Sequence, residues 1–391
     1  MDATGVPMIR LEAVSKRYPD GTVAVHSLDL EVGRGEVCVL VGPSGCGKTT
    51  TMRMINRLIE PSSGRIFLDG QDVTHADPVQ LRRRMGYVIQ QVGLFPHQTI
   101  EANVATVPAL LGWDRKRARA RVGELLELVG LDPGRYARRY PHELSGGQRQ
   151  RVGVARALAA DPPVLLMDEP FGAVDPIARD RLQEEFLRLQ AELGFTVVFV
   201  THDIEEAVRL GDRIAVMREG GHLEQYDTPA SILGAPATDF VADFVGADRG
   251  LKRLAVTDIR LDDLEQPPVV NLGVTSAEAL RVLEQAGARW AVVLDSGELR
   301  GWVGRDRLAA TEQVSQAVRR MEAWVPVGSS LKVALSTMLQ QDAGWVAVLD
   351  GDRYLGVLTP TTLHEALRRS VEADAAAVHP DQVDVESVAR A

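Results

Sequence analysis

Short apolar runs alternate with longer amphipathic stretches over residues 9–245, and this rhythm predicts an α/β domain. Three of the runs, residues 36–41, 164–167 and 196–200, are short, continuous and rich in aliphatic side chains. Strands that are buried on both faces in a parallel sheet have this pattern. Each run ends at a polar motif, so we expect these motifs to gather at the carboxyl edge of one sheet.

Between about residues 99 and 160 the pattern changes to a helical period. Leu125, Leu126, Leu128 and Val129 form an apolar stripe, which indicates a helical subdomain inserted into the α/β domain. A basic run at residues 115–121 precedes the stripe. We interpret this run as a solvated helix face, with a contact surface as the alternative.

An internal repeat follows residue 246. Residues 290–295 match residues 345–350 at an offset of 55 (345 minus 290), and Gly301 then aligns with Gly356. Each copy reads helix, strand, turn, strand, helix, and two such copies bury their apolar faces by packing on each other. We therefore predict a domain over 1–245 and a smaller α+β domain over 250–370, with copies at about 250–312 and 320–370. Residues 371–391 are acidic and poor in aromatic side chains, which predicts a flexible tail.

Net charge, cysteine count and the length of the apolar runs exclude several classes of protein. The formal net charge of −10 opposes general nucleic-acid binding, which needs a basic face against the phosphates. Two cysteines, Cys38 and Cys46, are too few for a disulfide framework, and the first residues lack the pattern of a secretion signal. No apolar run approaches the roughly 18 residues that span a bilayer. We expect a cytoplasmic protein that does not itself cross a membrane.

Residues 42–49 have the spacing of a phosphate-binding loop, placed after an apolar strand and before a helical stretch. The glycines let backbone N–H groups face a phosphate, Lys48 neutralises phosphate oxygens, and the Thr49 hydroxyl ligates Mg²⁺. A purely structural glycine turn has no need for Lys-Thr at the helix start. The loop therefore predicts an ATP site.

Polar side chains end the neighbouring strands. Asp168 and Glu169 follow a buried run, where two carboxylates need a cation or a proton-transfer role. Asp168 suits Mg²⁺, and Glu169 suits the base that polarises the attacking water. His202 follows residues 196–201 at the same edge and suits a hydrogen bond to the γ-phosphate. Gln90 follows residues 86–89 and suits Mg²⁺ or the water, so we predict Glu169, His202 and Gln90 as catalytic residues.

A second anion cradle lies at residues 144–148, where Ser-Gly-Gly at a helix start offers bare backbone N–H groups. The chain thus has two cradles but one acidic strand end. This arrangement suggests that two chains share two nucleotides.

Together these motifs resemble the nucleotide-binding subunit of an ABC transporter, over residues 9 to about 245. The resemblance implies an ABC ATPase of the P-loop NTPase fold, with ATP and Mg²⁺ as cofactors. It implies a homodimer through the ATPase domains, in which Ser145 and Gly147 of one chain contact the γ-phosphate held by the other. Tyr18 would stack on adenine, and Asp175 would be the D-loop acid. The implied ATP-binding residues are Tyr18, Gly42, Pro43, Ser44, Gly45, Cys46, Gly47, Lys48, Thr49, Thr50, Ser145, Gly146, Gly147, Gln148 and Asp175, and those for Mg²⁺ are Thr49, Gln90 and Asp168.

Residues 86–100 are similar to the Q-loop region of importers for glycine betaine, carnitine, choline and proline, and the C-terminal repeat resembles a tandem CBS pair. This implies a peripheral ATPase subunit on the cytoplasmic face of the cell membrane, with transmembrane permease subunits as partners. An extracellular or periplasmic substrate-binding protein would be an indirect partner, a regulatory ligand would bind the CBS pair, and no nucleic acid is expected. Leu94, Phe95 and Pro96 are either permease contacts or internal packing.

The CBS copies depart from relatives that bind adenosine phosphates, because the ribose-binding acid is missing after both Gly301 and Gly356. A cyclic dinucleotide, ionic-strength sensing and a purely dimerising role stay open as hypotheses. Trp290 and Trp345 are predicted as core residues rather than ligand platforms.

Three alternatives to this function stay open. The first is an importer ATPase for another small solute, such as an amino acid. The second is a soluble ABC ATPase outside transport, which the acidic single ATPase unit disfavours. The third is a sensor with a degenerate ATPase, which the intact Glu169 and His202 disfavour.

Overall fold

The structure, a computed structural model, describes residues 5–89, 93–172 and 174–378. The chain divides into two compact units. The first comprises Met1–Ile232 and Pro236–Val245, and the second comprises Leu233–Ala235 and Gly246–Ala391. Each unit has its own sheet and its own hydrophobic core.

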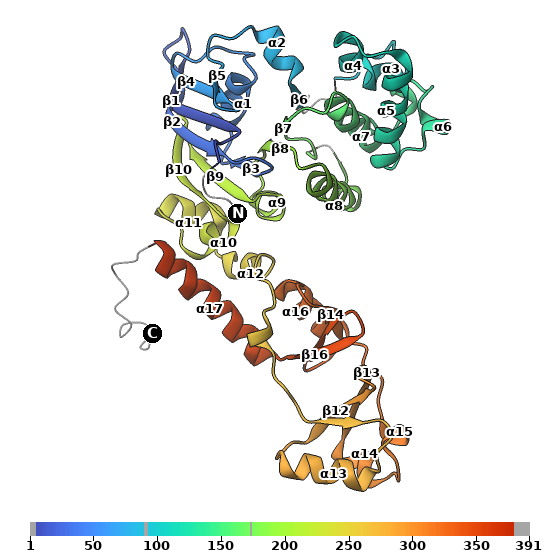
Figure 1. The fold of residues 1–391 in the computed structure, drawn as a ribbon. Coiled ribbons are helices and arrows are strands. Elements are labelled where there is room, and N and C mark those ends of the chain that lie inside the picture. Colours follow the sequence, from blue (N-terminus) through green and yellow to red (C-terminus); the bar gives the residue numbers. More distant parts are fainter. Residues whose placement is uncertain (1–4, 90–92, 173, 379–391) are drawn as a thin grey trace. The chain divides into compact units, whose positions relative to one another are not determined.

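The larger sheet of the first unit has the strand order β10-β9-β3-β8-β7-β6 (Figure 1). Five of its strands run parallel, and β10 pairs antiparallel with β9. Every residue of β3, β7 and β8 is buried, which confirms the parallel sheet predicted from the three apolar runs. The strands are β3 (Val37–Val41), β6 (Met85–Val88), β7 (Val164–Asp168), β8 (Thr196–Val200), β9 (Arg213–Arg218) and β10 (His222–Asp227).

A smaller antiparallel sheet has the order β2-β1-β4-β5. It consists of β1 (Ile9–Arg17), β2 (Val23–Val32), β4 (Ser63–Leu68) and β5 (Gln71–Asp72). Helix α1 (Lys48–Ile55) buries Met52, Met54 and Ile55 in the hydrophobic cluster that side chains of both sheets share. The phosphate-binding loop therefore leads into a helix that is anchored in the core of the unit.

The segment predicted as a helical subdomain consists of helices and no strands within the described residues 100–158. They are α3 (Ile100–Val104), α4 (Thr106–Leu110), α5 (Arg115–Leu128), α6 (Pro133–Tyr136), a 3₁₀ turn at Pro141–Glu143, and α7 (Gly146–Leu158). Leu125 and Leu126 of α5 are fully buried, whereas most of the basic run 115–121 is exposed. The basic run is thus a solvated helix face. The remaining helices of the unit are α2 (Pro78–Arg83), α8 (Pro176–Leu193), α9 (Ile204–Leu210), α10 (Pro229–Gly234) and α11 (Asp239–Val245).

The second unit shows the sequence repeat directly. Its sheet has the order β11-β12-β13-β16-β15-β14, so the two copies meet at their equivalent strands β13 and β16. Helices α13 and α16 begin 55 residues apart, as do strands β11 and β14. The elements are α12 (Arg249–Arg253), a 3₁₀ turn at Leu261–Asp263, β11 (Val269–Asn271), α13 (Ser276–Gln285), β12 (Trp290–Asp295), β13 (Glu298–Gly304), α14 (Arg305–Ala309), α15 (Val314–Ala317), β14 (Trp324–Pro326), α16 (Leu331–Gln340), β15 (Val346–Asp350), β16 (Arg353–Leu358) and α17 (Pro360–Val378).

The aligned glycines of the repeat are places where another segment crosses a strand. A Cβ atom on Gly301, at φ 153°, would lie 1.9 Å from the carbonyl oxygen of Arg319. A Cβ atom on Gly356, at φ 157°, would lie 2.8 Å from the side chain of Leu264. Only glycine permits approaches this close, which explains why both copies have glycine here.

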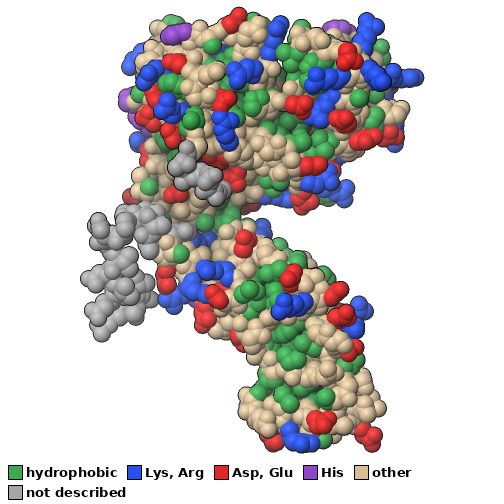
Figure 2. All heavy atoms as spheres, in the orientation of Figure 1, with side chains coloured by type: hydrophobic (Ala, Val, Ile, Leu, Met, Phe, Trp, Pro, Cys, Tyr) green, Lys and Arg blue, Asp and Glu red, His purple; other side chains and the backbone are tan. Residues whose placement is uncertain are grey.

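Two features of the second unit differ in detail from expectation. Trp290 and Trp345 are half-buried and stack on each other, with ring centroids 4.4 Å apart and planes inclined by 11°, instead of lying in the core. Helix α17 continues to Val378, so residues 371–378 of the predicted tail are helical; Glu and Ala favour helix there. Apolar side chains also show on the visible face of this unit (Figure 2), and Val333 and Leu339 of α16 are among its exposed ones.

Candidate functional site

The phosphate-binding loop connects β3 to α1 at the carboxyl edge of the parallel sheet. The Nζ atom of Lys48, which is only 6% exposed, donates to the carbonyl oxygens of Gly42 (2.7 Å) and Pro43 (2.8 Å). Cys46 also contacts the ammonium, with Sγ 3.4 Å from Nζ. The lysine therefore closes the loop on itself and concentrates positive charge at the helix start, where an anion is favoured.

Two glycines of the loop permit close backbone packing. A Cβ atom on Gly42, at φ 151°, would lie 2.1 Å from the Met217 carbonyl oxygen, and one on Gly47, at φ 95°, would lie 2.2 Å from that of Ala24. These contacts hold the loop against β9 and β2. The shape of the loop thus depends on residues distant in sequence as well as on its own spacing.

Asp168 ends β7 beside the start of α1. The Thr49 hydroxyl donates a hydrogen bond of 3.0 Å to its Oδ1 atom, and the carboxyl is 8% exposed. Burial raises the pKa of Asp168 above its ordinary value, and the bond from Thr49 partly opposes that shift. A buried carboxylate beside a hydroxyl is an oxygen pair that suits Mg²⁺.

Glu169 and His202 lie together at the rim of a cavity of about 260 Å³. His202 Nδ1 is 3.1 Å from Glu169 Oε1, and the histidine side chain is 65% exposed. Glu169 has φ 45°, a left-handed conformation that is held by a backbone bond to Val200, and such strain is common at functional sites. The cavity is lined by Ser44, Gly45, Gly47, Lys48, Thr49, Thr50, Glu169 and His202. The structure thus brings the predicted base and the predicted γ-phosphate donor to the phosphate-binding loop.

Tyr18 lies at a second cavity of about 570 Å³, together with Val23, Val25 and His26. Lys16 Nζ is 5.4 Å from the centroid of the Tyr18 ring and donates to the Glu60 carbonyl oxygen. Val25, which lines this cavity, lies next to Gly47 of the first cavity: its side chain would be 3.2 Å from a Cβ atom on that glycine. An extended ligand with an aromatic end and an anionic end fits such a pair of sites.

The second cradle starts α7. Ser145 caps the helix by accepting from the Gln148 backbone N–H (3.3 Å), and Gln148 Oε1 accepts from the Ser145 N–H (3.0 Å). Apart from the helix backbone and the chain neighbours, no atom lies within 4 Å of the place that a Cβ atom on Gly146 or Gly147 would take, and Gly146 is exposed. Neither cavity described above is lined by residues 145–148. An open anion cradle that does not complete its own chain's site is consistent with use by a second chain.

The remaining predicted site residues are placed differently. Asp175 is exposed just before α8 and lines neither cavity. Gln90 lies outside the described residues. In the following segment Phe95 is 41% exposed, Pro96 is exposed and Leu94 is half-buried. The exposed pair favours an external contact over internal packing.

Sequence reasoning missed the residues that support these loops. Asn103 is fully buried, and its side chain accepts from Phe95 N (2.7 Å) and donates to the carbonyl oxygens of Phe95, Gln98 and Thr99. Arg156 of α7 donates to the carbonyl oxygen of Gly93 (2.7 Å). Neither residue belongs to a phosphate motif. A polar residue on an otherwise apolar helix face, as Asn103 is beside Ile100 and Val104, is the only sequence signal for them.

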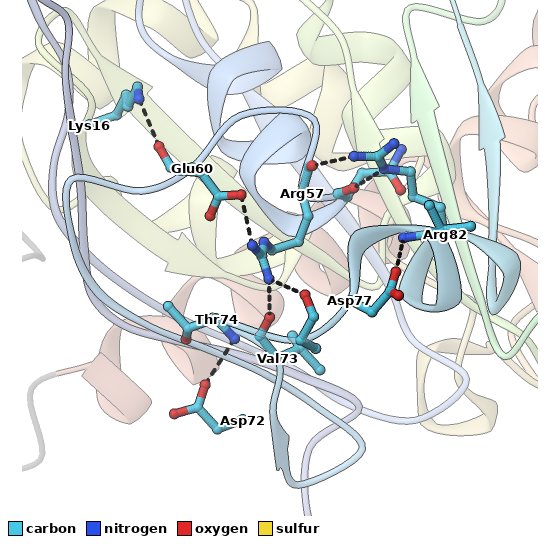
Figure 3. Close-up of polar contacts among 11 residues, drawn as sticks. Lys16, Arg57, Glu60, Asp72, Val73, Thr74, Asp77 and Arg82 are labelled. Carbon is cyan, nitrogen blue, oxygen red and sulfur yellow. Dashed lines mark hydrogen bonds and ion pairs between the residues drawn. The ribbon is translucent and has the colours of Figure 1, made fainter.

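Arg57 supports the other end of the phosphate-binding helix (Figure 3). It has φ 51° and is 7% exposed, and its guanidinium donates to the carbonyl oxygens of Val73 (3.0 Å) and Ala76 (2.7 Å) and to Glu60 Oε1 (2.7 Å). Arg82 of α2 donates to the Arg57 carbonyl oxygen (2.7 Å). The C-terminus of α1 is thereby fixed to the turn after β5 and to α2, and both cations lie where the helix dipole favours positive charge.

Within the described residues, every helix is too short, too polar or both to form a membrane span. No group of three or more His, Cys, Asp or Glu side chains in residues 5–89, 93–172 and 174–378 is arranged to hold a metal ion.

Comparison with known proteins places the chain among transport ATPases. Residues 25–172 match the family described as ABC transporter, and residues 312–369 match the CBS domain. The chain is 45% identical over 374 residues to the Glycine betaine/carnitine/choline transport ATP-binding protein OpuCA of Bacillus subtilis, an alignment that covers 94% of this chain and 98% of that protein. It is 45% identical to the Osmoprotectant import ATP-binding protein OsmV of Salmonella typhimurium, with 90% of this chain and 94% of that protein covered.

Solved structures resemble the first unit. A dimeric structure of MJ0796, a bacterial ABC transporter cassette, aligns with a TM-score of 0.52 and 36% identity, and covers 57% of this chain and 99% of that chain. A dimeric post-hydrolysis state of the same cassette, bound to ADP and Pi, aligns with a TM-score of 0.52 and 35% identity over the same shares.

Proposed function

The chain belongs to the ABC transporter family of ATP-binding proteins, and from this premise we propose that it is the ATP-hydrolysing subunit of an importer for quaternary amines or related compatible solutes. Glycine betaine, choline, carnitine and proline are the candidate solutes. The relatives that align with nearly the whole chain, CBS region included, have names that specify such solutes. The observation that carries the ATPase activity is the Glu169–His202 pair at the rim of the phosphate-binding cavity.

The proposed chemistry assigns one task to each part. Lys48 exchanges its bonds to the loop carbonyl oxygens for bonds to phosphate oxygens, and the loop N–H groups complete the cradle. Glu169 orients the attacking water and accepts its proton, while His202 donates to the γ-phosphate. Tyr18 stacks on the adenine.

Mg²⁺ fits the oxygen pair of Thr49 and Asp168. The two side chains are 3.0 Å apart, and desolvation of the Asp168 carboxylate is a cost that a bound cation offsets. When bound, Mg²⁺ would neutralise charge on the β- and γ-phosphates. Gln90 completes the proposed set as a neutral ligand.

Two copies of the chain complete the sites in this proposal. Ser145 and Gly147 of one copy contact the γ-phosphate on the other, because their open cradle is not needed by the site of their own chain. The dimeric structures of the MJ0796 cassette support this arrangement. Closure of the dimer on ATP would move permease subunits bound at the cytoplasmic face of the membrane, and an external binding protein would supply the solute. The Phe95 and Pro96 surface is the proposed permease contact.

A test of the ATPase assignment is Glu169→Gln. Because general-base catalysis contributes roughly 10²–10⁴-fold, steady-state phosphate release should fall at least about a hundredfold while ATP binding persists and a closed dimer accumulates. Phosphate release, nucleotide binding and size-exclusion chromatography measure these three quantities. Glu192→Gln, at an exposed position of α8, is the matched control and should keep wild-type turnover. Full turnover by Glu169→Gln would refute the role of Glu169.

The solute is tested by uptake. Cells that produce the chain with its permease and binding protein should accumulate radiolabelled glycine betaine, choline, carnitine or proline, and the Glu169→Gln variant should not. Uptake confined to a different class of solute would contradict the substrate part of the proposal and leave the ATPase part standing.

A further inference from the structure

A half-buried polar cluster connects the segment around His202 to helix α8, which begins directly after Asp175. At its centre is Glu206 of α9, whose Oε1 atom accepts a hydrogen bond of 2.9 Å from Gln183 Nε2. Gln183 is 3% exposed, although it lies on a long helix with many charged side chains. A buried amide that bonds a carboxylate across two helices holds those helices at a defined separation.

Asp203 connects the first turn of α9 to the segment around the histidine. The Thr201 hydroxyl, which is 2% exposed, accepts from the Asp203 backbone N–H (3.0 Å), and Asp203 Oδ1 accepts from the Glu206 backbone N–H (3.4 Å). Thr201 directly precedes His202 in the chain. The position of the His202 backbone is therefore tied to Glu206 through one residue.

The other side of the cluster reaches the turn at residues 174–175. Arg179 donates to the Val174 carbonyl oxygen (3.2 Å), and its backbone N–H bonds the Asp175 carbonyl oxygen (2.8 Å). The charge of Arg179 also acts on Glu206, as one of the influences that favour the ionised carboxylate, whereas burial raises the pKa of Glu206. Gln183 and Arg179 lie one turn apart on α8, so the helix that bonds the Glu206 carboxylate also holds the 174–175 turn.

From these contacts we propose that Glu206 is a positioning residue that fixes His202 relative to the turn carrying Asp175. The inference rests on the proposed function, in which His202 acts on its own chain's nucleotide. Because the Gln183–Glu206 bond joins α8 to the first turn of α9, a displacement of one helix start also displaces the other. When the 174–175 turn changes position at the contact with a second chain, His202 follows. Glu206 thus couples the two shared sites without touching ATP.

The test compares Glu206→Ala with Glu205→Ala, its exposed neighbour on the first turn of α9. Loss of the cluster should lower kcat roughly ten- to hundredfold, as expected for a misplaced catalytic group, and leave KM within about twofold. The Hill coefficient for ATP should fall from above 1 in the wild-type chain to about 1. Glu205→Ala should match the wild-type chain in kcat, KM and Hill coefficient.

Two further variants separate positioning from folding. Glu206→Gln keeps an oxygen that accepts from Gln183, and should retain kcat within about threefold of the wild-type value. Gln183→Met removes the donor at similar volume, and should lower the Hill coefficient as Glu206→Ala does. If Glu206→Gln loses as much activity as Glu206→Ala, or if all kcat losses follow the fraction of unfolded protein at an unchanged Hill coefficient, the proposal is wrong.

The wild-type chain distinguishes this proposal from the one it rests on. A wild-type chain without ATPase activity would refute the proposed function. A wild-type chain that hydrolyses ATP cooperatively, together with a Glu206→Ala variant of equal kcat and Hill coefficient, would refute only the role of Glu206.

Discussion

The ammonium of Lys48 can bond either the loop carbonyl oxygens or a phosphate, and this explains why the loop keeps its shape without a bound nucleotide. Its ammonium bonds the carbonyl oxygens of Gly42 and Pro43 and is almost completely buried. A buried ammonium without such bonds would be costly, so the loop carbonyls stabilise the charge until a phosphate replaces them. In the proposed function, the same residue therefore shapes the cradle and binds the anion.

Cys38 makes the stability of the first unit depend on alkaline pH. Burial raises the pKa of its thiol to about 12 from an ordinary value of 9.0. Between pH 9.0 and about pH 12 the thiol loses its proton in the unfolded chain but keeps it in the folded chain. Deprotonation therefore lowers the free energy of the unfolded state, and the unfolding free energy falls as pH rises. Cys38→Ala removes this contribution. Between pH 9 and pH 11, the unfolding free energy of the variant should therefore fall by about 2 kcal/mol less than that of the wild-type chain.

Urea denaturation at each pH measures that difference. Val39→Ala is the matched control, since Val39 is equally buried on the same strand and has no titratable group. It should lower stability at every pH by a similar amount and keep the wild-type slope. Equal pH slopes for Cys38→Ala and the wild-type chain would show that the thiol does not contribute.

At the scale of elements, the sequence predicted those features that follow from local patterns of apolar and polar residues, namely the buried strands and the sheet edge at which they end. The strands β3, β7 and β8 are continuous apolar runs, and each is followed by a polar motif, so their burial and the common edge of Lys48, Asp168 and His202 were predictable. Gln183 was not, because a glutamine on a charged helix is usually exposed and its burial depends on α9 packing against α8. The stacking of Trp290 on Trp345 depends likewise on how two copies of the repeat meet.

Helix α1 gives a prediction about the end opposite the phosphate site. Arg57→Met keeps most of the buried volume but removes the bonds to Val73, Ala76 and Glu60 (Figure 3). Buried carbonyl oxygens left without donors should lower the unfolding free energy by about 2–4 kcal/mol. Thermal denaturation of the full chain measures this loss. The control is Arg84→Met, an exposed arginine after α2, and an equal midpoint for both variants would contradict a structural role for Arg57.

At the scale of the whole molecule, the chain has separate cores for separate tasks. The cluster that contains Met52 and Val198 belongs to the first unit, whereas the clusters around Val348 and Val293 belong to the two copies in the second. Cooperative unfolding follows a continuous core, so each unit should have its own thermal transition. The residues proposed to bind the nucleotide all belong to the first unit, so the response to ATP is a way to identify the thermal transition of that unit.

Calorimetry of the Glu169→Gln chain with Mg²⁺ and ATP tests this division. A ligand at 100 times its Kd stabilises the state that binds it by about 2.7 kcal/mol, so the transition of the first unit should move to higher temperature. The transition of the second unit should stay in place, because both copies of the repeat lack the ribose-binding acid expected from their resemblance to CBS domains that bind adenosine phosphates. A further substitution, Lys48→Ala, should abolish the shift. If ATP moves the second transition instead, and still does so in the Lys48→Ala background, the CBS copies bind ATP despite the missing acid and the assignment of nucleotide binding to the first unit alone is wrong.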